Sequence, residues 1–526
     1  MSKASEMARV SAAGGFNLLW GLVASTVISA AGTIAITYIL GAENYGLYSI
    51  ALIAPTLIAT FRDWGVNSAM VKYSAQYRAE NNSKIRSIFI SGLFFEIILG
   101  LSLSVFCFAL SPFLATTLHR PTIVPLIQIT SFFILTGGLS NAAVAAFTGL
   151  EKMHFYSFTL IIQSIIKTVL IVTLVLLGLG TLGAVTGFTT ASLIASLAGI
   201  LLMWTIYRSL PKSANGKSEI MATIKTMFNY GLPVSIATIL SGLLSTFYSY
   251  ILAIYVTNNA TIGNYNLAVT FSVLITFFAN PVTTMMFPAF SKLDYEKDHE
   301  TLKNVFQYSV KYASLIVVPI TALVIALAQP GIGTIYQNRY SQAPLFLALF
   351  SASYFYTAFG NLSISSLLNG QGFTKFNMYL TLLTVSIGFP VGFFLISKYG
   401  VIGLIAITLT ASLPSLLVSL RFIKKRFNVS VDWVSSAKIL FSSIITAILT
   451  YALISQLAFS NPIRLVVGII AFVSIFILAI LLTRTIDKGD VNSLREIINV
   501  MGPLRKPLRF LLNLIEKLMT ALHTNG

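Results

Sequence analysis

Two ionisable side chains, Glu96 and Lys167, interrupt apolar stretches that are long enough to cross a membrane. A charge at mid-bilayer depth costs at least about 2.5–3.5 kcal/mol on insertion scales, so such residues face a bundle interior or a cavity. Both lie about ten positions into their predicted spans, which at a rise of about 1.5 Å per residue gives them similar depths. We therefore expect Glu96 and Lys167 to share a polar site. Three interpretations stay open: a proton- or cation-responsive pair, a contact of Lys167 to a pyrophosphate, or a structural ion pair that orients two helices.

Uncharged polar residues gather on three later apolar stretches. Tyrosine rings and amides suit sugars, which offer hydroxyl groups at their edges and C–H faces for stacking. Hydrogen bonding between helices is the alternative for any single residue. The candidate binding residues are Asn229, Tyr230, Tyr248, Asn280, Tyr354 and Asn361.

Arg62 and Asp63 end the predicted second span. They are candidates for a gate or for a contact to lipid headgroups, and the alternative is an ordinary helix end whose long side chain reaches toward water. Other chemistry is missing from the sequence. The four histidines are scattered without metal-ligand spacing, no phosphate-binding loop or nucleophile arrangement occurs, and Cys107 lies in an apolar run. We expect no enzyme activity, no cofactor and no metal site.

Composition determines the class of protein that must position these residues. Hydrophobic residues make up 56% of the 526 residues, charged residues make up 10%, and the mean hydropathy is +0.84. A soluble globule of this size needs more polar surface, so the chain is predicted to be an all-α polytopic membrane protein. With about 20 residues per span, we expect fourteen helices, at 16–40, 45–61, 87–110, 122–147, 156–178, 182–207, 229–256, 265–290, 309–328, 343–368, 377–397, 400–420, 437–459 and 463–483.

The pattern of predicted membrane spans occurs twice in the sequence. Three separated blocks of residues recur at a nearly constant shift of about 220 positions, which is hard to obtain by chance, and such repeats are typical of alternating-access transporters. The matches are Gly46, Tyr48 and Ala51 with Gly263, Tyr265 and Ala268; Gly149 and Phe155 with Gly370 and Phe376; Gly180, Gly183 and Thr190 to Leu193 with Gly400, Gly403 and Thr410 to Leu413.

Six spans fall in each copy, so both copies enter the bilayer in the same direction and form a parallel repeat. The predicted domains are a six-helix bundle at 1–208, its repeat at 225–424, two additional helices at 437–485 and a cytoplasmic tail at 486–526. In the tail, leucine and isoleucine recur at helical spacing opposite polar residues. This pattern predicts an amphipathic helix that lies on the inner leaflet.

Lysine and arginine set the orientation. All but five of the 34 fall in segments on one side of the predicted spans; the five are Arg120, Arg339, Lys398 and Arg464 in the opposite loops, and Lys167. Both termini are therefore expected in the cytoplasm. The net charge of +18 is then explained by anchoring to anionic membrane lipids. Nucleic-acid binding is not needed to explain it.

Short motifs carry a resemblance to a known family. They are the turn from Leu40 to Tyr48, the Asp63, Trp64, Gly65 stretch leading to Lys72 and Tyr73, and the segment Tyr230 to Pro233. In these the chain resembles the polysaccharide-export branch of the multidrug/oligosaccharidyl-lipid/polysaccharide (MOP) superfamily, which contains the Wzx-type oligosaccharide flippases. The resemblance implies two six-helix bundles in a V, a central cleft, and translocation of a polyprenyl-type lipid that carries a glycan.

The expected function is thus the flipping of a lipid-linked oligosaccharide from the inner to the outer face of the cytoplasmic membrane, for polysaccharide or glycan biosynthesis. A proton or cation is a candidate for the driving force. However, relatives often place a charged residue on the seventh helix where this chain reads Phe247, Tyr248, Ser249 and Tyr250. The alternatives are a cation-coupled multidrug exporter of the same superfamily and a membrane glycosyltransferase or polysaccharide polymerase. The last of these would be expected to carry a long, charged outer loop.

Overall fold

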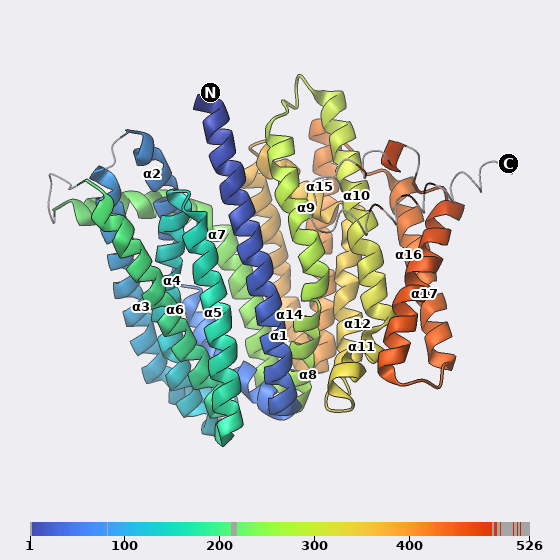
Figure 1. The fold of residues 1–526 in the computed structure, drawn as a ribbon, viewed down its shortest axis with the longest axis horizontal. Helices are drawn as coiled ribbons and strands as arrows, with labels where there is room; N and C mark the ends of the chain where they lie inside the picture. The colour runs from blue at the N-terminus through green and yellow to red at the C-terminus, as the bar shows by residue number, and fades with distance from the viewer. Residues whose placement is uncertain are drawn as a thin grey trace. The chain divides into compact units, whose positions relative to one another are not determined.

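The computed structural model of the chain describes residues 3–80, 83–211, 218–486 and 489–491, and the single positions 495, 509, 513 and 516. Every regular element in these residues is a helix, which confirms the all-α prediction (Figure 1). The predicted amphipathic helix of the tail lies almost wholly outside the described residues.

The chain divides into two compact units. Unit 1 contains residues 1–266 and 385–407, and unit 2 contains residues 267–384 and 408–526. The predicted division into copies at 1–208 and 225–424, with two further helices at 437–485, stays a prediction.

Unit 1 holds the first seven α-helices, most of α8 and the middle of α14. Within it α1 packs on α5, α3 on α4, and α6 on both α4 and α5. The helices that begin in this unit are α1 (Lys3–Ala59), α2 (Val66–Glu80), α3 (Ser83–Thr117), η1 (Pro121–Ile123), α4 (Val124–Gly149), α5 (Met153–Leu174), η2 (Val175–Leu179), α6 (Gly180–Ser209), α7 (Ser218–Tyr255) and α8 (Asn259–Phe271).

Unit 2 holds the remaining helices and both ends of α14. Here α10 packs on α16, and α16 packs on α17. The helices are α9 (Val273–Ser291), α10 (His299–Ala326), α11 (Ala328–Tyr336), α12 (Ala343–Ser351), η3 (Ala352–Phe359), α13 (Asn361–Gly370), α14 (Thr374–Thr410), α15 (Leu413–Phe427), α16 (Trp433–Gln456) and α17 (Asn461–Leu482).

Ten stretches of the described chain are long and apolar enough to cross a membrane, or eleven if the bent pair Ala343–Phe359 and Asn361–Gly370 forms one span. The predicted number of fourteen is therefore not confirmed. Three of the ten stretches contain a glycine with positive φ at or next to a predicted loop. These glycines are Gly41 (φ 71°), Gly180 (φ 49°) and Gly400 (φ 56°).

Two of these breaks are related by the sequence repeat. Gly180 has φ 49° and ψ −130°, and its counterpart Gly400 has φ 56° and ψ −128°. Only glycine adopts this backbone region without strain. A second related pair, Glu151 (φ 57°) and Gly372 (φ 80°), has positive φ just after a helix end. The repeated residues thus occupy repeated local geometry.

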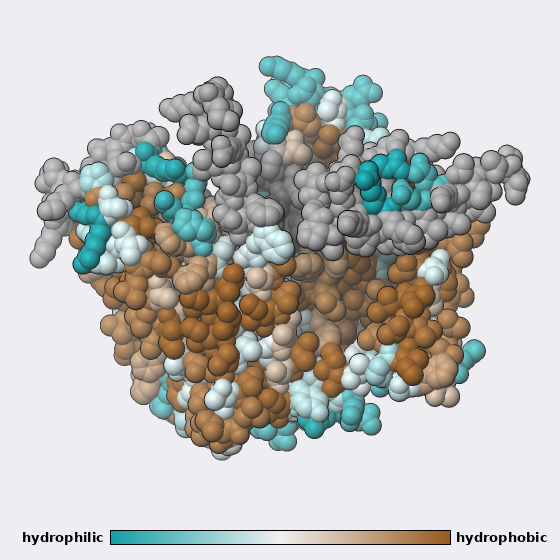
Figure 2. All heavy atoms as spheres, in the orientation of Figure 1, coloured by the Kyte–Doolittle hydropathy of each residue, from teal (hydrophilic) through white to brown (hydrophobic). Residues whose placement is uncertain are grey.

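Large apolar side chains cover the outside of the helices. On the face shown in Figure 2 they occupy the middle of the helices, and hydrophilic residues lie toward the ends. Leu176, Leu201 and Leu482 are 68%, 65% and 74% exposed. Apolar surface on this scale marks contact with lipid, and the chain is a multi-pass membrane protein.

Backbones approach closely inside unit 1 where glycines face each other. A Cβ added to Gly46 would collide with the carbonyl oxygen of Asn259 and lie 3.0 Å from the Gly263 nitrogen, and Gly263 meets Gly46 in return. Because helices in lipid associate through close packing, small residues at such crossings are required. Gly46 and Gly263 are counterparts in the repeat, so α1 and α8 meet there through equivalent positions.

We expect Gly46→Ala to lower the melting temperature of the purified protein in detergent, because the new methyl group overlaps backbone atoms. Overpacking of this kind costs about 1–3 kcal/mol. Gly331→Ala is the matched control. It adds the same group inside α11, where the nearest atom is Leu465 Cδ1 at 4.0 Å, and it improves helix propensity. Equal melting temperatures for the two variants would contradict the tight crossing.

Candidate functional site

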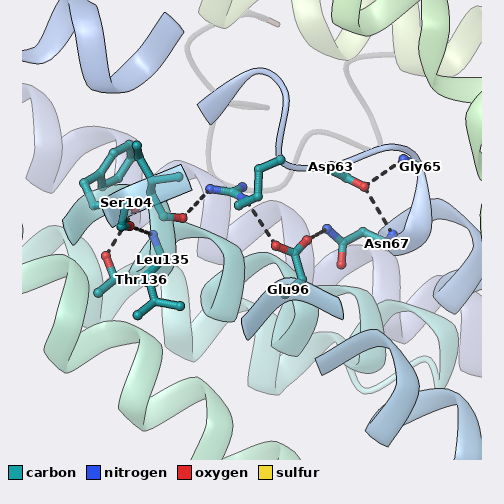
Figure 3. A network of polar contacts seen from close by, with 10 residues as sticks. Asp63, Gly65, Asn67, Glu96, Ser104, Leu135 and Thr136 are labelled. Carbon is teal, nitrogen blue, oxygen red and sulfur yellow. Dashed lines mark hydrogen bonds and ion pairs between the residues drawn. The ribbon is translucent and has the colours of Figure 1, made fainter. Parts of the chain in front are cut away.

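A buried polar network surrounds Glu96 in unit 1 (Figure 3). The Glu96 side chain is fully buried, and its Oε2 lies 3.1 Å from Nε of Arg62, which is also buried. Asn67 donates from Nδ2 to Glu96 Oε1 at 2.6 Å. A buried carboxylate needs both a countercharge and hydrogen bonds, and here an arginine and an amide supply them.

The turn between α1 and α2 places these partners. Asp63 Oδ1 accepts hydrogen bonds from the backbone nitrogens of Gly65 at 2.9 Å and Asn67 at 3.4 Å, and so satisfies amides at the start of α2. Asn67 lies in the first turn of α2, and Arg62 lies before the cap. Arg62 Nη1 donates to the carbonyl oxygen of Ile134 on α4 at 2.9 Å.

Two glycines of α4 make room for the ion pair. A Cβ at Gly137 would lie 3.0 Å from Arg62 Nη1, and a Cβ at Gly138 would collide with Glu96 Oε2 and come within 2.9 Å of Arg62 Cδ. Sequence reasoning missed Asn67, Gly137 and Gly138. The available signal was a pair of adjacent glycines inside an apolar span, which marks a close approach.

A second polar layer lies beside this network on the same helices. Ser104 donates to the carbonyl oxygen of Ser131 at 2.9 Å and accepts from the Leu135 nitrogen at 3.1 Å, and Thr136 shares a hydrogen bond of 2.8 Å with Ser192. These contacts tie α3, α4 and α6 together. They hold the backbone around Ile134 that receives Arg62.

The expected contact between Glu96 and Lys167 is not among the ion pairs of the described residues. Glu96 is instead paired with Arg62, because the turn after α1 returns the arginine to the bundle interior rather than to the water phase. Lys167 lies half-buried on α5, which packs on α1. No carboxylate in the described parts of the chain lies within ion-pair distance of it.

The remaining candidates are divided between the two units. Asn229 is exposed, and Tyr230 lies under the Lys72 ammonium group, with Nζ 3.8 Å from the ring centroid. Tyr248 is buried against α14, where its hydroxyl oxygen would lie 2.5 Å from a Cβ at Gly388. The side chain of Asn280 is outside those that the structure describes.

In unit 2, Tyr354 packs against the small core cluster of Ile275, Ala279 and Val317. Asn361 lines a cavity of 140 Å³ between α13, α14 and α15. Neutral polar groups dominate its wall: Ser365, Asn377, Thr381, Thr384, Ser412, Ser415 and Ser419. Asn361 is thus a predicted sugar-binding residue that the structure places in a cavity lined by hydroxyl groups.

Arg120 is a further residue that sequence reasoning did not single out. It lies between α3 and η1 and is buried. Its guanidinium group donates to Asn259 Oδ1 at 2.7 Å and to the carbonyl oxygens of Leu118, Ala253, Val256 and Thr257 at 2.6–3.0 Å. Burial lowers the pKa of this guanidinium, but arginine stays charged in proteins. The cation satisfies one carbonyl in the last turn of α7 and two just after the helix end, where positive charge is favourable.

The fold is similar to those of solved membrane transporters, one of which is described as a member of the MOP superfamily. The structure of "Lipid II flippase MurJ, inward closed conformation" matches with a TM-score of 0.71 at 16% identity, over 88% of this chain and 97% of that one. An inward-facing multidrug resistance MATE family transporter of the MOP superfamily matches with a TM-score of 0.60 at 15% identity, over 77% of this chain and 94% of that one.

The sequence identifies the family within this fold. Residues 11–294 match the family described as "Polysaccharide biosynthesis protein", and the chain belongs to it. An uncharacterized membrane protein of Methanocaldococcus jannaschii, MJ1375, is 26% identical over 72% of this chain and 90% of its own length. Lipopolysaccharide biosynthesis protein WzxC of Escherichia coli is 22% identical over 72% of this chain and 77% of its own length.

Replacing Glu96 should destabilise the protein. Glu96→Ala leaves the Arg62 guanidinium buried without its countercharge, and losing one partner of a buried pair costs about 3–5 kcal/mol. We expect a clear fall in the melting temperature in detergent. Glu151→Ala is the control, because its pair with Arg78 is about half exposed and is worth at most about 1 kcal/mol. An equal effect of both substitutions would contradict a buried pair.

Arg120→Gln should also destabilise the protein, because several carbonyl groups at the end of α7 lose a charged donor, and each such bond contributes about 1.5–3 kcal/mol. The melting temperature measures the effect. Lys398→Gln removes an exposed cation from the same predicted side and should change little. If Arg120→Gln has the same melting temperature as the parent protein, the hydrogen bonds of Arg120 contribute no net stability.

Proposed function

We propose that the chain flips a lipid-linked oligosaccharide, built on a polyprenyl-phosphate-type carrier, from the inner to the outer face of the cytoplasmic membrane by alternating access. The product serves polysaccharide or glycan biosynthesis. Membership in the polysaccharide biosynthesis family supports this proposal. The names of two similar proteins agree with it, one a lipopolysaccharide biosynthesis protein and one a lipid II flippase.

The observation that carries the proposal is Lys167. It is a cation within an apolar span, and no carboxylate of the described residues neutralises it. Intramembrane cations are retained where they serve a polar pathway. An ammonium group that has no protein countercharge matches a ligand that brings its own negative charge, as a phosphate-linked glycan lipid does.

Glu96 has a different proposed role. Its carboxylate is already held by Arg62 and Asn67, so it is not a direct sugar ligand. Protonation of Glu96, which lies on α3, would remove the charge that holds Arg62 and loosen the junction of α3 with the end of α1, α2 and α4. We place a coupling proton there, and Arg62 and Asp63 become part of a hinge in place of a surface gate.

The neutral polar cavity of unit 2 is the proposed contact for a single sugar unit of the glycan, because at 140 Å³ it is too small for the whole oligosaccharide. Its hydroxyl and amide side chains donate and accept hydrogen bonds without adding charge. Asn361 is the predicted residue that we retain for this role.

A cation-coupled multidrug exporter is the second candidate, since the fold is shared with a multidrug resistance transporter. The two functions differ in the charge of the cargo. A pathway that contains an unneutralised lysine favours an anionic lipid over a cationic drug.

The test is transport by the full-length protein in liposomes. A fluorescent polyprenyl-diphosphate oligosaccharide is added to one leaflet, and its crossing is followed by chemical quenching. We expect crossing with the parent protein and a rate about tenfold lower for Lys167→Gln, which is the loss of one charge-assisted contact. Lys167→Arg should retain most of the rate.

Lys152→Gln is the matched control, since Lys152 lies in the turn between α4 and α5, outside the apolar spans. A parent protein that moves a lipophilic cationic dye but not the glycan lipid would reverse the order of the two functions. Normal flipping by Lys167→Gln would remove Lys167 from the pathway.

A further inference from the structure

A cavity of 210 Å³ lies in unit 1 between α2, the start of α3 and the first part of α7. These three helices pack on one another, at the end of unit 1 that carries α2 in Figure 1. Its polar wall is made by Tyr73, Tyr77, Lys84, Ser87, Thr223 and Thr226. The lining residues that the structure describes include a cation and several hydroxyl groups but no carboxylate.

The wall combines positive charge with aromatic rings. Lys84 Nζ lies 5.1 Å from the centroid of the Tyr77 ring, and Lys72 Nζ lies 3.8 Å from the centroid of the neighbouring Tyr230 ring. Tyr73 stacks on Tyr77, with centroids 6.2 Å apart, and meets Tyr230 edge to face. Tyrosines of this kind are favoured at the membrane interface because one end of the ring is apolar and the other end is wet.

The floor of the cavity is part of a buried core cluster of unit 1. Ile88 and Met227, which line it, are buried in the same core cluster as Met70, and Tyr73 and Tyr77 pack on that cluster. The aromatic wall is therefore held by packed side chains and is formed in advance of any ligand, as binding pockets usually are.

Size and charge restrict what the cavity accepts. At 210 Å³ it is smaller than the roughly 300–1,000 Å³ of pockets for drug-sized molecules, so an oligosaccharide is too large. A phosphate group with one adjoining ring or glycerol unit is the right size. Ammonium and hydroxyl donors are the groups that bind phosphate oxygens.

We propose that this cavity binds the phosphate-bearing headgroup of a membrane amphiphile at the cytoplasmic face, where the lysine and arginine count places the segment from Arg62 to Arg86. Two amphiphiles share this chemistry: the polyprenyl-phosphate end of the cargo and an ordinary anionic phospholipid. Only the first identity rests on the proposed function. In that case the cavity is a loading site, distinct from Lys167 within the span.

The test is binding of a fluorescent polyprenyl phosphate to the full-length protein in phosphatidylcholine nanodiscs. Lys84→Gln should weaken binding about tenfold, as expected for the loss of one charge-assisted hydrogen bond, and Lys84→Arg should stay within about twofold. Tyr77→Ala should also weaken it. Lys84 is exposed, so its two substitutions are not expected to unfold the protein. Tyr77 packs on the core cluster, so the melting temperature of Tyr77→Ala is measured beside its binding.

Lys297→Gln is the matched control, because Lys297 is an exposed lysine in a segment predicted on the same side of the membrane, with a side chain that is 84% exposed. The proposal is overturned if Lys84→Gln binds like the parent protein, if Lys297→Gln weakens binding equally, or if polyprenol without phosphate binds as well as the phosphate. Competition by phosphatidylglycerol separates the two sources. Equal displacement identifies a phospholipid site, and resistance to displacement identifies a loading site for the cargo.

Flipping assays separate this inference from the proposed function. If the parent protein flips the glycan lipid while Lys84→Gln changes neither binding nor rate, the headgroup site fails and the function stands. If the parent protein does not flip the glycan lipid but anion binding still depends on Lys84, the function fails and the headgroup site stands.

Discussion

The fold of unit 1 depends on pairing the buried carboxylate of Glu96, which water does not reach, with a positive charge. A carboxylate within apolar helices is tolerated only with a partner that is equally buried. Arg62 meets this condition because the chain turns after α1 and because Gly137 and Gly138 leave space beside Glu96. One ion pair thereby ties the end of α1 and the start of α2 to α3 and to the middle of α4. The same junction is where we propose that a coupling proton acts.

Close packing is the second constraint, and it acts with the first. Lipid supplies no hydrophobic force between helices, so association relies on contact between backbones and on internal polar bonds. Gly46 against Gly263 and Gly65 against Gly231 supply the contact. Arg120 supplies polar bonds at the end of α7. In each case the residues lie far apart in sequence, so each contact holds together segments that are not neighbours along the chain.

Composition and hydropathy were enough to predict an all-α membrane protein, and the motifs from Leu40 to Tyr73 were enough to predict its superfamily. The partners within the site were harder to predict. The depth of a residue along a helix can be counted from the sequence, and this count led to the expectation that Glu96 lies beside Lys167. The direction in which a side chain faces cannot be counted in this way, because it depends on the rotation of the helix and on neighbouring glycines. Arg62 was assigned to the surface because it ends a span. Its side chain faces the bundle interior because of the turn between α1 and α2, and a hydropathy pattern does not predict that turn.

The glycine breaks at Gly180 and Gly400 have nearly the same backbone angles although most side chains around them differ. A position that is restricted by φ and ψ accepts almost no substitution, whereas a lipid-facing leucine can be exchanged for any residue of similar size. In the predicted repeat, bends of this kind should therefore resist sequence divergence more than the surfaces that face lipid.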